Sequence, residues 1–173
     1  MNKKLMVLLG ASALLLTACG GGSTQGTDKA NGKNQSLVDN SATVTGAAGN
    51  DIDLGNGVKI KLSEAKHFVP GQFASNYVKG QTANLFEATV TNGSKSAIDW
   101  ATVSFVITTS NGGACPDVLD GDAGVNGQPT DPLAAGASET FKFGIACDVK
   151  PGADLNVKIT VGDKSADVKA KLA

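Results

Sequence analysis

Few side chains in this sequence could carry out catalysis, and the single histidine is the first to consider. His67 stands in the segment Lys66-His67-Phe68 at the end of a predicted strand. A Ser-His-Asp hydrolase would have to use it, yet no Gly-x-Ser-x-Gly turn or comparable nucleophile context accompanies it. We therefore interpret His67 as a surface or loop residue, and we expect neither a catalytic residue nor an enzyme.

The first residues of the chain have the pattern of a secretory signal peptide. Lys3 and Lys4 precede a mostly apolar run over residues 5–18. Such a run suits a signal peptide, and it is shorter than the roughly 20 residues that span a bilayer. Residues 20–23 are Gly-Gly-Gly-Ser, so no cationic stop-transfer cluster follows. We predict a signal peptide over residues 1–18 rather than a permanent transmembrane helix.

Cys19 is preceded by three residues that fit a bacterial lipobox at each position: Leu16, Thr17 and Ala18. In this motif the peptide is cleaved before the cysteine, whose sulfur then carries a diacylglyceryl group, and two or more acyl chains anchor a protein stably. The sequence therefore predicts a lipoprotein attached to the lipid bilayer through acylated Cys19. It would lie on the outer face of the bacterial cytoplasmic membrane or in the cell envelope. The alternative is an ordinary signal peptide with Cys19 merely beside the cleavage site.

The other two of the three cysteines form a candidate disulfide. With Cys19 assigned to lipid, Cys115 and Cys147 are left as a pair for an oxidising compartment. Their bond would close a loop of about 33 residues and stabilise the domain by roughly 3–4 kcal/mol in the chain-entropy model. A redox-active pair is the alternative, but these cysteines are far apart in sequence, unlike the closely spaced dithiol of an oxidoreductase.

The charged residues argue against a nucleic-acid partner. The chain has 15 basic and 16 acidic residues, and losing Lys3 and Lys4 with the signal peptide leaves a net charge of about −3. Every basic residue is a lysine, whereas surfaces that read bases or grip phosphates favour the bidentate arginine. Non-specific binding would need a basic patch. We therefore expect no nucleic acid among the partners.

A polar segment separates Cys19 from the first clear strand. Residues 20–50 are mostly Gly, Ser, Thr, Asn, Gln, Ala and Asp, with few large apolar residues such as Leu37, Val38 and Val44. Such a segment cannot bury enough apolar surface to offset the entropy of ordering. We predict a lipidated cysteine and disordered tether over residues 19–50 and a folded domain over residues 51–173. In the alternative, residues 43–52 join the domain as a leading strand.

From residue 51 onward, apolar and polar residues alternate with the period of two that is typical of half-buried strands. The inward-facing sets are Val58, Ile60, Leu62; Phe86, Ala88, Val90; Phe141, Phe143, Ile145, Cys147; Leu155, Val157, Ile159, Val161; and Ala166, Val168, Ala170, Leu172. Residues 100–109 are more apolar and are predicted to be a central strand, Asn92-Gly93 a turn, and Gly162-Asp163-Lys164 the turn of a hairpin. No segment of similar length has a helical period. We predict an all-β fold, an antiparallel β-sandwich of about six to eight strands.

Three stretches resemble a bacterial family: residues 58–64, residues 88–94 (Ala-Thr-Val-Thr-Asn-Gly-Ser), and residues 133–138 leading into Phe141 and Phe143. They are similar to extracytoplasmic immunoglobulin-like lipoprotein domains of unknown function, which are related in fold to a secreted mycobacterial immunoprotective antigen. The resemblance covers roughly residues 52–172. It implies an immunoglobulin-like sandwich outside the cytoplasm and offers no catalytic residues. The Cys-Trp-Cys order of antibody domains is absent, so Trp100 is interpreted as a core or edge aromatic.

Two loops are candidate binding surfaces, since long loops on rigid scaffolds often carry recognition. Residues 70–81 hold Phe73 and Tyr77 among small polar residues, which suits a protein-binding surface; these aromatics could equally fold back over one end of the sandwich. Residues 115–131 hold Asp117, Asp120, Asp122 and Asp131. Our leading hypothesis is a non-enzymatic module that binds another envelope protein or a host protein.

The acidic loop also raises the alternative of a small-ligand or calcium-binding module, because calcium prefers carboxylate and carbonyl oxygens. On the EF-hand template that begins at Asp122, the third position is Gly124 rather than an acid, and the twelfth is Leu133 rather than glutamate. We therefore interpret residues 115–131 as a solvated loop rich in turn formers and braced by the disulfide. We expect no metal and no cofactor.

Overall fold

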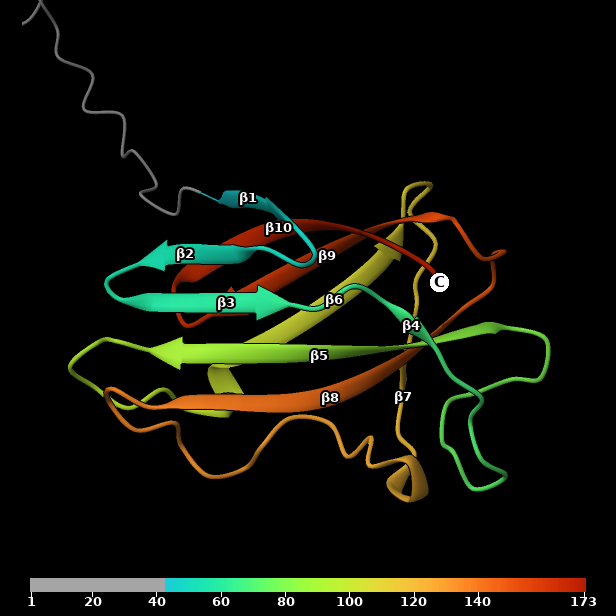
Figure 1. Cartoon of the computed structure of the whole chain (residues 1–173), viewed down its shortest axis with the longest axis horizontal. Coiled ribbons are helices and arrows are strands. Elements are labelled where there is room, and N and C mark those ends of the chain that lie inside the picture. The colour runs from blue at the N-terminus through green and yellow to red at the C-terminus, as the bar shows by residue number, and fades with distance from the viewer. Residues whose placement is uncertain (1–42) are drawn as a thin grey trace, which may run out of the picture. The chain divides into compact units, whose positions relative to one another are not determined.

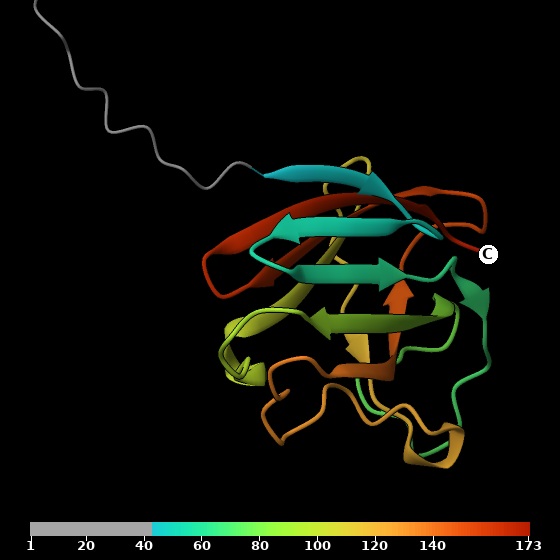
Figure 2. The same cartoon turned by 60° about the vertical axis from the view of Figure 1, so that its left-hand side comes forward.

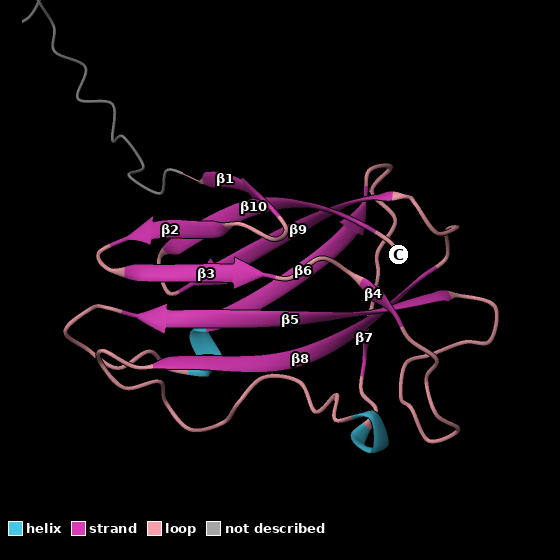
Figure 3. Cartoon of the chain, in the orientation of Figure 1, coloured by secondary structure: helices cyan, strands magenta, loops and turns pink. Residues whose placement is uncertain are grey.

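Two β-sheets pack face to face in the computed structural model, which describes residues 43–173 as part of one compact unit (Figure 1). The four-stranded sheet has the order β1 (Val44–Ala47), β10 (Lys164–Lys171), β9 (Asp154–Val161) and β6 (Val103–Thr109). The six-stranded sheet has the order β2 (Asp51–Gly55), β3 (Val58–Leu62), β5 (Thr82–Asn92), β8 (Ser138–Cys147) and β7 (Asp117–Val118), with β4 (Lys66–His67) also paired to β5. Two 3-10 turns, η1 (Trp100–Thr102) and η2 (Gly121–Ala123), are the only helical segments of the described chain (Figure 3). The fold is the predicted immunoglobulin-like β-sandwich.

The core lies between the sheets and follows the predicted alternation. Each inward-facing set is buried, and the set on β8 ends with Cys147 at the end of the strand. Phe86 and Phe143 stack with their ring centroids 5.4 Å apart. Burying side chains of this size contributes about 1.5–3 kcal/mol each. Trp100 is a core aromatic that packs edge-on against Phe141, but it lies in η1 rather than in the predicted strand, because the Asp99 side chain caps the turn.

One side of the sandwich is closed by the first two strands, which belong to different sheets. β1 adds in parallel to β10, and β2 pairs antiparallel with β3. The chain can cross between the sheets here because Gly46 has no side chain: a Cβ on Gly46 would lie 2.6 Å from Ile52. The first strand of the described residues, β1, begins at Val44, within residues 44–50 that the sequence assigned to the tether. This agrees with the alternative of a leading strand; residues 19–42 of the predicted tether lie outside the described residues.

The opposite side of the sandwich is formed by β6 of one sheet and by β7 and β8 of the other. β6 pairs only with β9 along its length, so it is an edge strand and not the predicted central strand. The connection between β6 and β8 returns alongside this strand, where Cys115 N–H donates to Ile107 O at 3.0 Å, and the apolar Val106 on its other face is 55% exposed. We call this side the seam of the sandwich.

Three turns differ in how clearly the sequence predicts them. Asn56 and Gly57, both with positive φ of 54° and 81°, join β2 to β3 in the way that Asn-Gly commonly joins strands. The predicted β9–β10 hairpin is confirmed, with Val161 opposite Lys164. The predicted turn at Asn92-Gly93 is wrong in one respect. Asn92 is the last, fully buried residue of β5, and the chain turns only after it.

Candidate binding site

The two loops predicted as separate binding surfaces lie side by side at one end of the sandwich (Figure 2). Ser75 N–H donates to Leu119 O at 2.9 Å, and Gly71 N–H donates to the Asp120 carboxylate at 2.7 Å. These bonds join segments that are remote in the sequence. We refer to residues 68–81 and 116–127 together as the paired loops.

Asp120 holds the paired loops together rather than facing solvent. Its residue is only 4% exposed. Besides Gly71, its carboxylate accepts a bond from Ala123 N–H at 3.3 Å, and its backbone pairs with Val125. A carboxylate that accepts hydrogen bonds from the backbone of two segments fixes those segments relative to each other. Asp120 was predicted as a binding residue, and the structure gives it a structural role.

Beneath the paired loops is a small apolar core, separate from the main one. Ala83, Val118, Val125 and Ala146 are fully or almost fully buried but do not belong to the main cluster. The ring of Phe68 lies close to β8, where a Cβ on Gly144 would be 3.2 Å from it. Satellite clusters of this kind commonly lie under long loops. The paired loops are therefore packed onto the sandwich.

The outer surface of the paired loops is unusually apolar. Phe73 is 81% exposed, and the other exposed large apolar side chains here are Val69, Val78 and Leu119. Tyr77 is half-buried and Asp122 is exposed. The alternative in which both aromatics fold back over the sandwich end does not hold for Phe73. Contiguous exposed apolar patches, rather than single exposed residues, mark interaction surfaces, and these loops carry four exposed large apolar side chains.

Asp117 occupies a different position, at the mouth of a pocket in the seam. In the register of β7 with β8 it lies opposite Ile145, so it shares the inward face of that sheet, whereas Val118 opposite Gly144 shares the outer face. The pocket, of about 250 Å³, is lined by residues of the paired loops and of strands β6 and β8, among them Asp117, Val118, Leu119, Phe105, Phe141 and Phe143. Partial burial raises the pKa of the Asp117 carboxyl above its ordinary value; the residue as a whole is exposed, so the effect is modest.

The predicted disulfide between Cys115 and Cys147 is present. The two Cα atoms are 4.5 Å apart and both residues are buried. The Cys115 backbone is hydrogen-bonded to β6, and Cys147 is the last residue of β8. The disulfide therefore fastens the two sheets together at the end of the seam beside the paired loops. A buried disulfide is poorly accessible to attacking thiols, which favours the structural role over the redox alternative.

The acidic side chains do not converge on a metal. Asp117 faces the seam, Asp120 faces backbone N–H groups, and Asp122 is exposed. Within residues 43–173 no group of three His, Cys, Asp or Glu side chains could hold a metal ion. His67 is exposed on β4. The same residues contain no helix long and apolar enough to span a bilayer.

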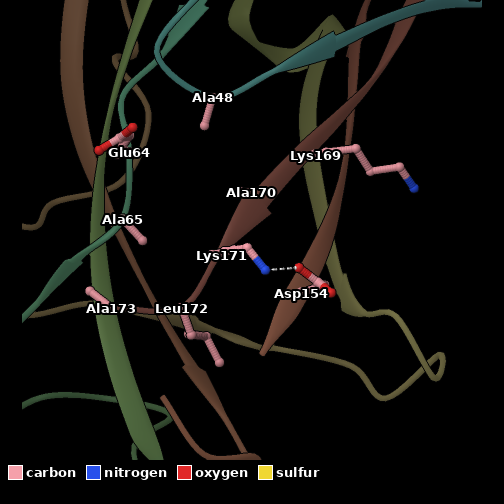
Figure 4. A pocket seen from close by; sticks show the side chains of 9 residues that line it. All are labelled: Ala48, Glu64, Ala65, Asp154, Lys169, Ala170, Lys171, Leu172 and Ala173. Carbon is pink, nitrogen blue, oxygen red and sulfur yellow. Dashed lines mark hydrogen bonds and ion pairs between the residues drawn. The ribbon is translucent and has the colours of Figure 1, made fainter. Parts of the chain in front are cut away.

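A larger hollow, of about 480 Å³, lies beside the C-terminal end of β10 (Figure 4). Ala48, Glu64 and Ala65 line one side of it, and Lys171 and Asp154 lie on the other. The Lys171 ammonium is paired with the Asp154 carboxylate, and Lys169 bonds to Asn156. Its cations are thus already partnered on the surface of the sheet. This hollow offers weaker chemistry for a ligand than the seam pocket or the paired loops.

A β-sandwich that carries a braced pair of loops at one end is the class of protein these features define. No family model and no curated protein matches the chain. Among solved structures it is similar to the ycdA protein of Bacillus subtilis, described as a candidate lipoprotein, with a TM-score of 0.57 and 14% identity. The match covers 69% of this chain and 38% of that one, so the chain spans well under half of that protein's length.

Two further structures are similar at lower scores. The secreted protein MPT63 of Mycobacterium tuberculosis has a TM-score of 0.49 and 16% identity, covering 75% of this chain and 97% of that one. A β-sandwich protein of Clostridium difficile 630 has a TM-score of 0.46 and 12% identity, covering 73% and 93%. At such identities, similarity to a solved structure concerns the fold alone, and the ycdA match supports the β-sandwich.

Proposed function

We propose that this protein is a lipid-anchored, extracytoplasmic binding module that uses the paired loops to hold another protein of the envelope or of a host, without catalysis. One observation carries the proposal: an exposed aromatic, Phe73, stands on loops that are hydrogen-bonded and packed onto the sandwich. Rigid aromatic anchors surrounded by small polar residues supply much of the energy of protein interfaces. The buried disulfide suits an oxidising compartment.

The position of the loops agrees with an anchored protein. β1 begins at Val44, opposite Ala166 and close to the β9–β10 turn, whereas the paired loops adjoin Cys147 at the other end of the sheets (Figure 1). A lipid on Cys19 would therefore attach the domain by the end that is remote from Phe73. The tether predicted to follow Cys19 would let this surface reach partners in the envelope or outside the cell.

The anchor is tested by Cys19→Ala. Cells that express the natural chain should incorporate a radioactive fatty acid into it, and the protein should partition into detergent; the variant should lose both properties because the thioether cannot form. Ser23→Ala, which alters a nearby residue but keeps the thiol, should behave like the natural chain. Label that persists on Cys19→Ala, or that is absent from the natural chain, would refute lipidation at this residue.

The binding surface is tested by Phe73→Ser. Cross-linking on intact cells should capture a partner with the natural chain, and the variant should weaken the interaction on the order of 30-fold, as expected for an interface hot spot. The matched control is Val106→Ser, because Val106 is also a large apolar side chain, 55% exposed, but lies on β6. Capture that is equally strong with Phe73→Ser, or no captured protein from the natural chain, would count against the proposal.

A further inference from the structure

The seam pocket is open because the sandwich is closed by strands on only one side. β1 and β2 close the far side. On the seam side the edge strands are β6 and the two-residue β7, which pairs with β8 only at residues 144 and 145. Phe105 points inward from β6 yet stays half-buried, as expected for a core residue at an incompletely covered edge. The pocket is thus a gap at the edge of the main core. It adjoins the paired loops, because Asp117, Val118 and Leu119 line it, whereas Phe73 does not.

The floor of the pocket is aromatic. The ring centroid of Phe105 is 5.1 Å from that of Phe143 and 5.7 Å from that of Phe141, and the rings are inclined to one another by 40° and 80°. All three rings line the pocket, and Phe105 is the most exposed of them, since Phe141 and Phe143 are buried. The negative face of an aromatic ring attracts an organic cation within about 6 Å. The floor therefore suits a ligand with an apolar body and a positive charge.

The rim of the pocket supplies a carboxylate that no cation satisfies. Asp117 is the one ionisable residue among the described residues that line the pocket. The ion pairs found within residues 43–173 join Lys61 to Asp51, Lys164 to Asp163 and Lys171 to Asp154, and none includes Asp117. Lys142 on β8 has the opposite parity from Phe141 and Phe143 and is exposed on the outer face. A partly buried carboxylate without a partner gains from a cation that brings its own charge.

We propose that the seam pocket binds a small organic ammonium ion with an apolar body, its ammonium group on the Asp117 carboxylate and its body against Phe105, Phe141 and Phe143. The volume of about 250 Å³ admits a ligand of the size of a phenylalkylamine and not a larger cofactor. The site does not depend on a protein partner at the paired loops. The proposed ligand of this acidic loop is therefore an organic cation, and not the calcium ion that its sequence suggested as an alternative.

The test is a titration of the purified protein with 2-phenylethylamine, followed by NMR of the phenylalanine ring resonances. The amine should shift the signals of Phe105, Phe141 and Phe143 and bind with a dissociation constant of about millimolar, as expected for so few atoms. 2-Phenylethanol has the same body without the charge and should bind at least about tenfold more weakly. 3-Phenylpropionate, an anion, should produce no shifts at these rings.

Three variants locate the site. Asp117→Asn should weaken the amine about tenfold, to the affinity of the alcohol, and should unfold at the same or a higher temperature because it removes a partly buried charge. Asp122→Asn, which neutralises an exposed acid of the same loop, should leave affinity unchanged. Phe105→Leu should weaken the amine about two- to fivefold by removing a ring face. Equal binding of amine and alcohol, full affinity in Asp117→Asn, or no shift of these rings by the amine would overturn the proposal.

Discussion

Replacing both Cys115 and Cys147 by alanine should lower the free energy of unfolding by about 3–4 kcal/mol. The disulfide closes a loop of about 33 residues, and the main effect of losing it is that the unfolded chain gains conformations. Both residues are buried in the main core, so the lost sulfur atoms also leave unfilled space. The loss is a large fraction of the stability of a typical domain, which is about 5–15 kcal/mol.

The measurement is denaturation by urea, with the natural chain under reducing conditions as the control for the substitutions. Both the double variant and the reduced chain should unfold at lower urea concentration and with a steeper dependence on urea, since an uncrosslinked unfolded state exposes more surface. Hydrogen exchange should rise most at the amide of residue 115, which donates to Ile107 O, and in the paired loops. A loss below about 1 kcal/mol would show that the seam is held without the bond.

This prediction bears on where the protein can function. A domain that depends on one buried disulfide for several kcal/mol is much less stable in a reducing cytoplasm than outside it. Loss of the disulfide should also disturb the two candidate sites, the paired loops and the seam pocket, because the disulfide fastens the two sheets beside them. An oxidising compartment would therefore favour the intact sites.

The main core was predictable because its signal is local. Along β8, the residues Phe141, Phe143, Ile145 and Cys147 alternate with residues of the other face, and each of the four is buried. The same holds for the β9–β10 hairpin, whose turn and two strands are adjacent in sequence. β1 was harder to predict because Val44–Ala47 is short and small, and only its parallel pairing with β10, far along the chain, makes it a strand.

The candidate sites were only partly predictable for the same reason. The sequence singled out both loops, but which face each aspartate takes depends on the register of β7 against β8. That register sends Asp117 into the seam, while Asp120 meets Gly71 on a loop remote in sequence. Phe105 lies on the inward face of β6, yet nothing local in the sequence shows that β6 lies at an edge. Edges and seams are properties of the assembled sheets.

Two of the stretches on which the family resemblance was based are joined by hydrogen bonds in the structure. Residues 88–94 and residues 133–138 are well separated in the chain, and both meet at Asn92. Its side-chain Nδ2 donates to Leu133 O at 2.9 Å, to Ala134 O at 3.2 Å and to Ser96 O at 2.8 Å. Its Oδ1 accepts from Ser94 N–H at 3.1 Å and from the Ser94 hydroxyl at 2.6 Å. One buried amide therefore fixes the turn after β5 and the approach to β8.

Asn92→Ala should lower the free energy of unfolding by about 2–4 kcal/mol, because it leaves buried carbonyl oxygens and an N–H group without partners. Asn92→Asp should cost more at neutral pH, since it would direct a buried carboxylate at the carbonyl oxygens of Ser96, Leu133 and Ala134. That repulsion and burial would raise the pKa of the new carboxyl in the folded state. The folded variant would then bind its proton more tightly than the unfolded chain, so its stability should recover as the pH falls through the raised pKa.

The control for both variants is Thr91→Ala, on the opposite face of the same strand. Thr91 bonds to the Ser138 hydroxyl at an exposed position, so its loss should cost less than about 1 kcal/mol. Urea denaturation of the three variants and the natural chain, at neutral and at mildly acidic pH, measures the free energy of unfolding of each and how it changes with pH. If Asn92→Ala costs no more than Thr91→Ala, or if Asn92→Asp is as stable as the natural chain at neutral pH, the amide does not hold these two segments together.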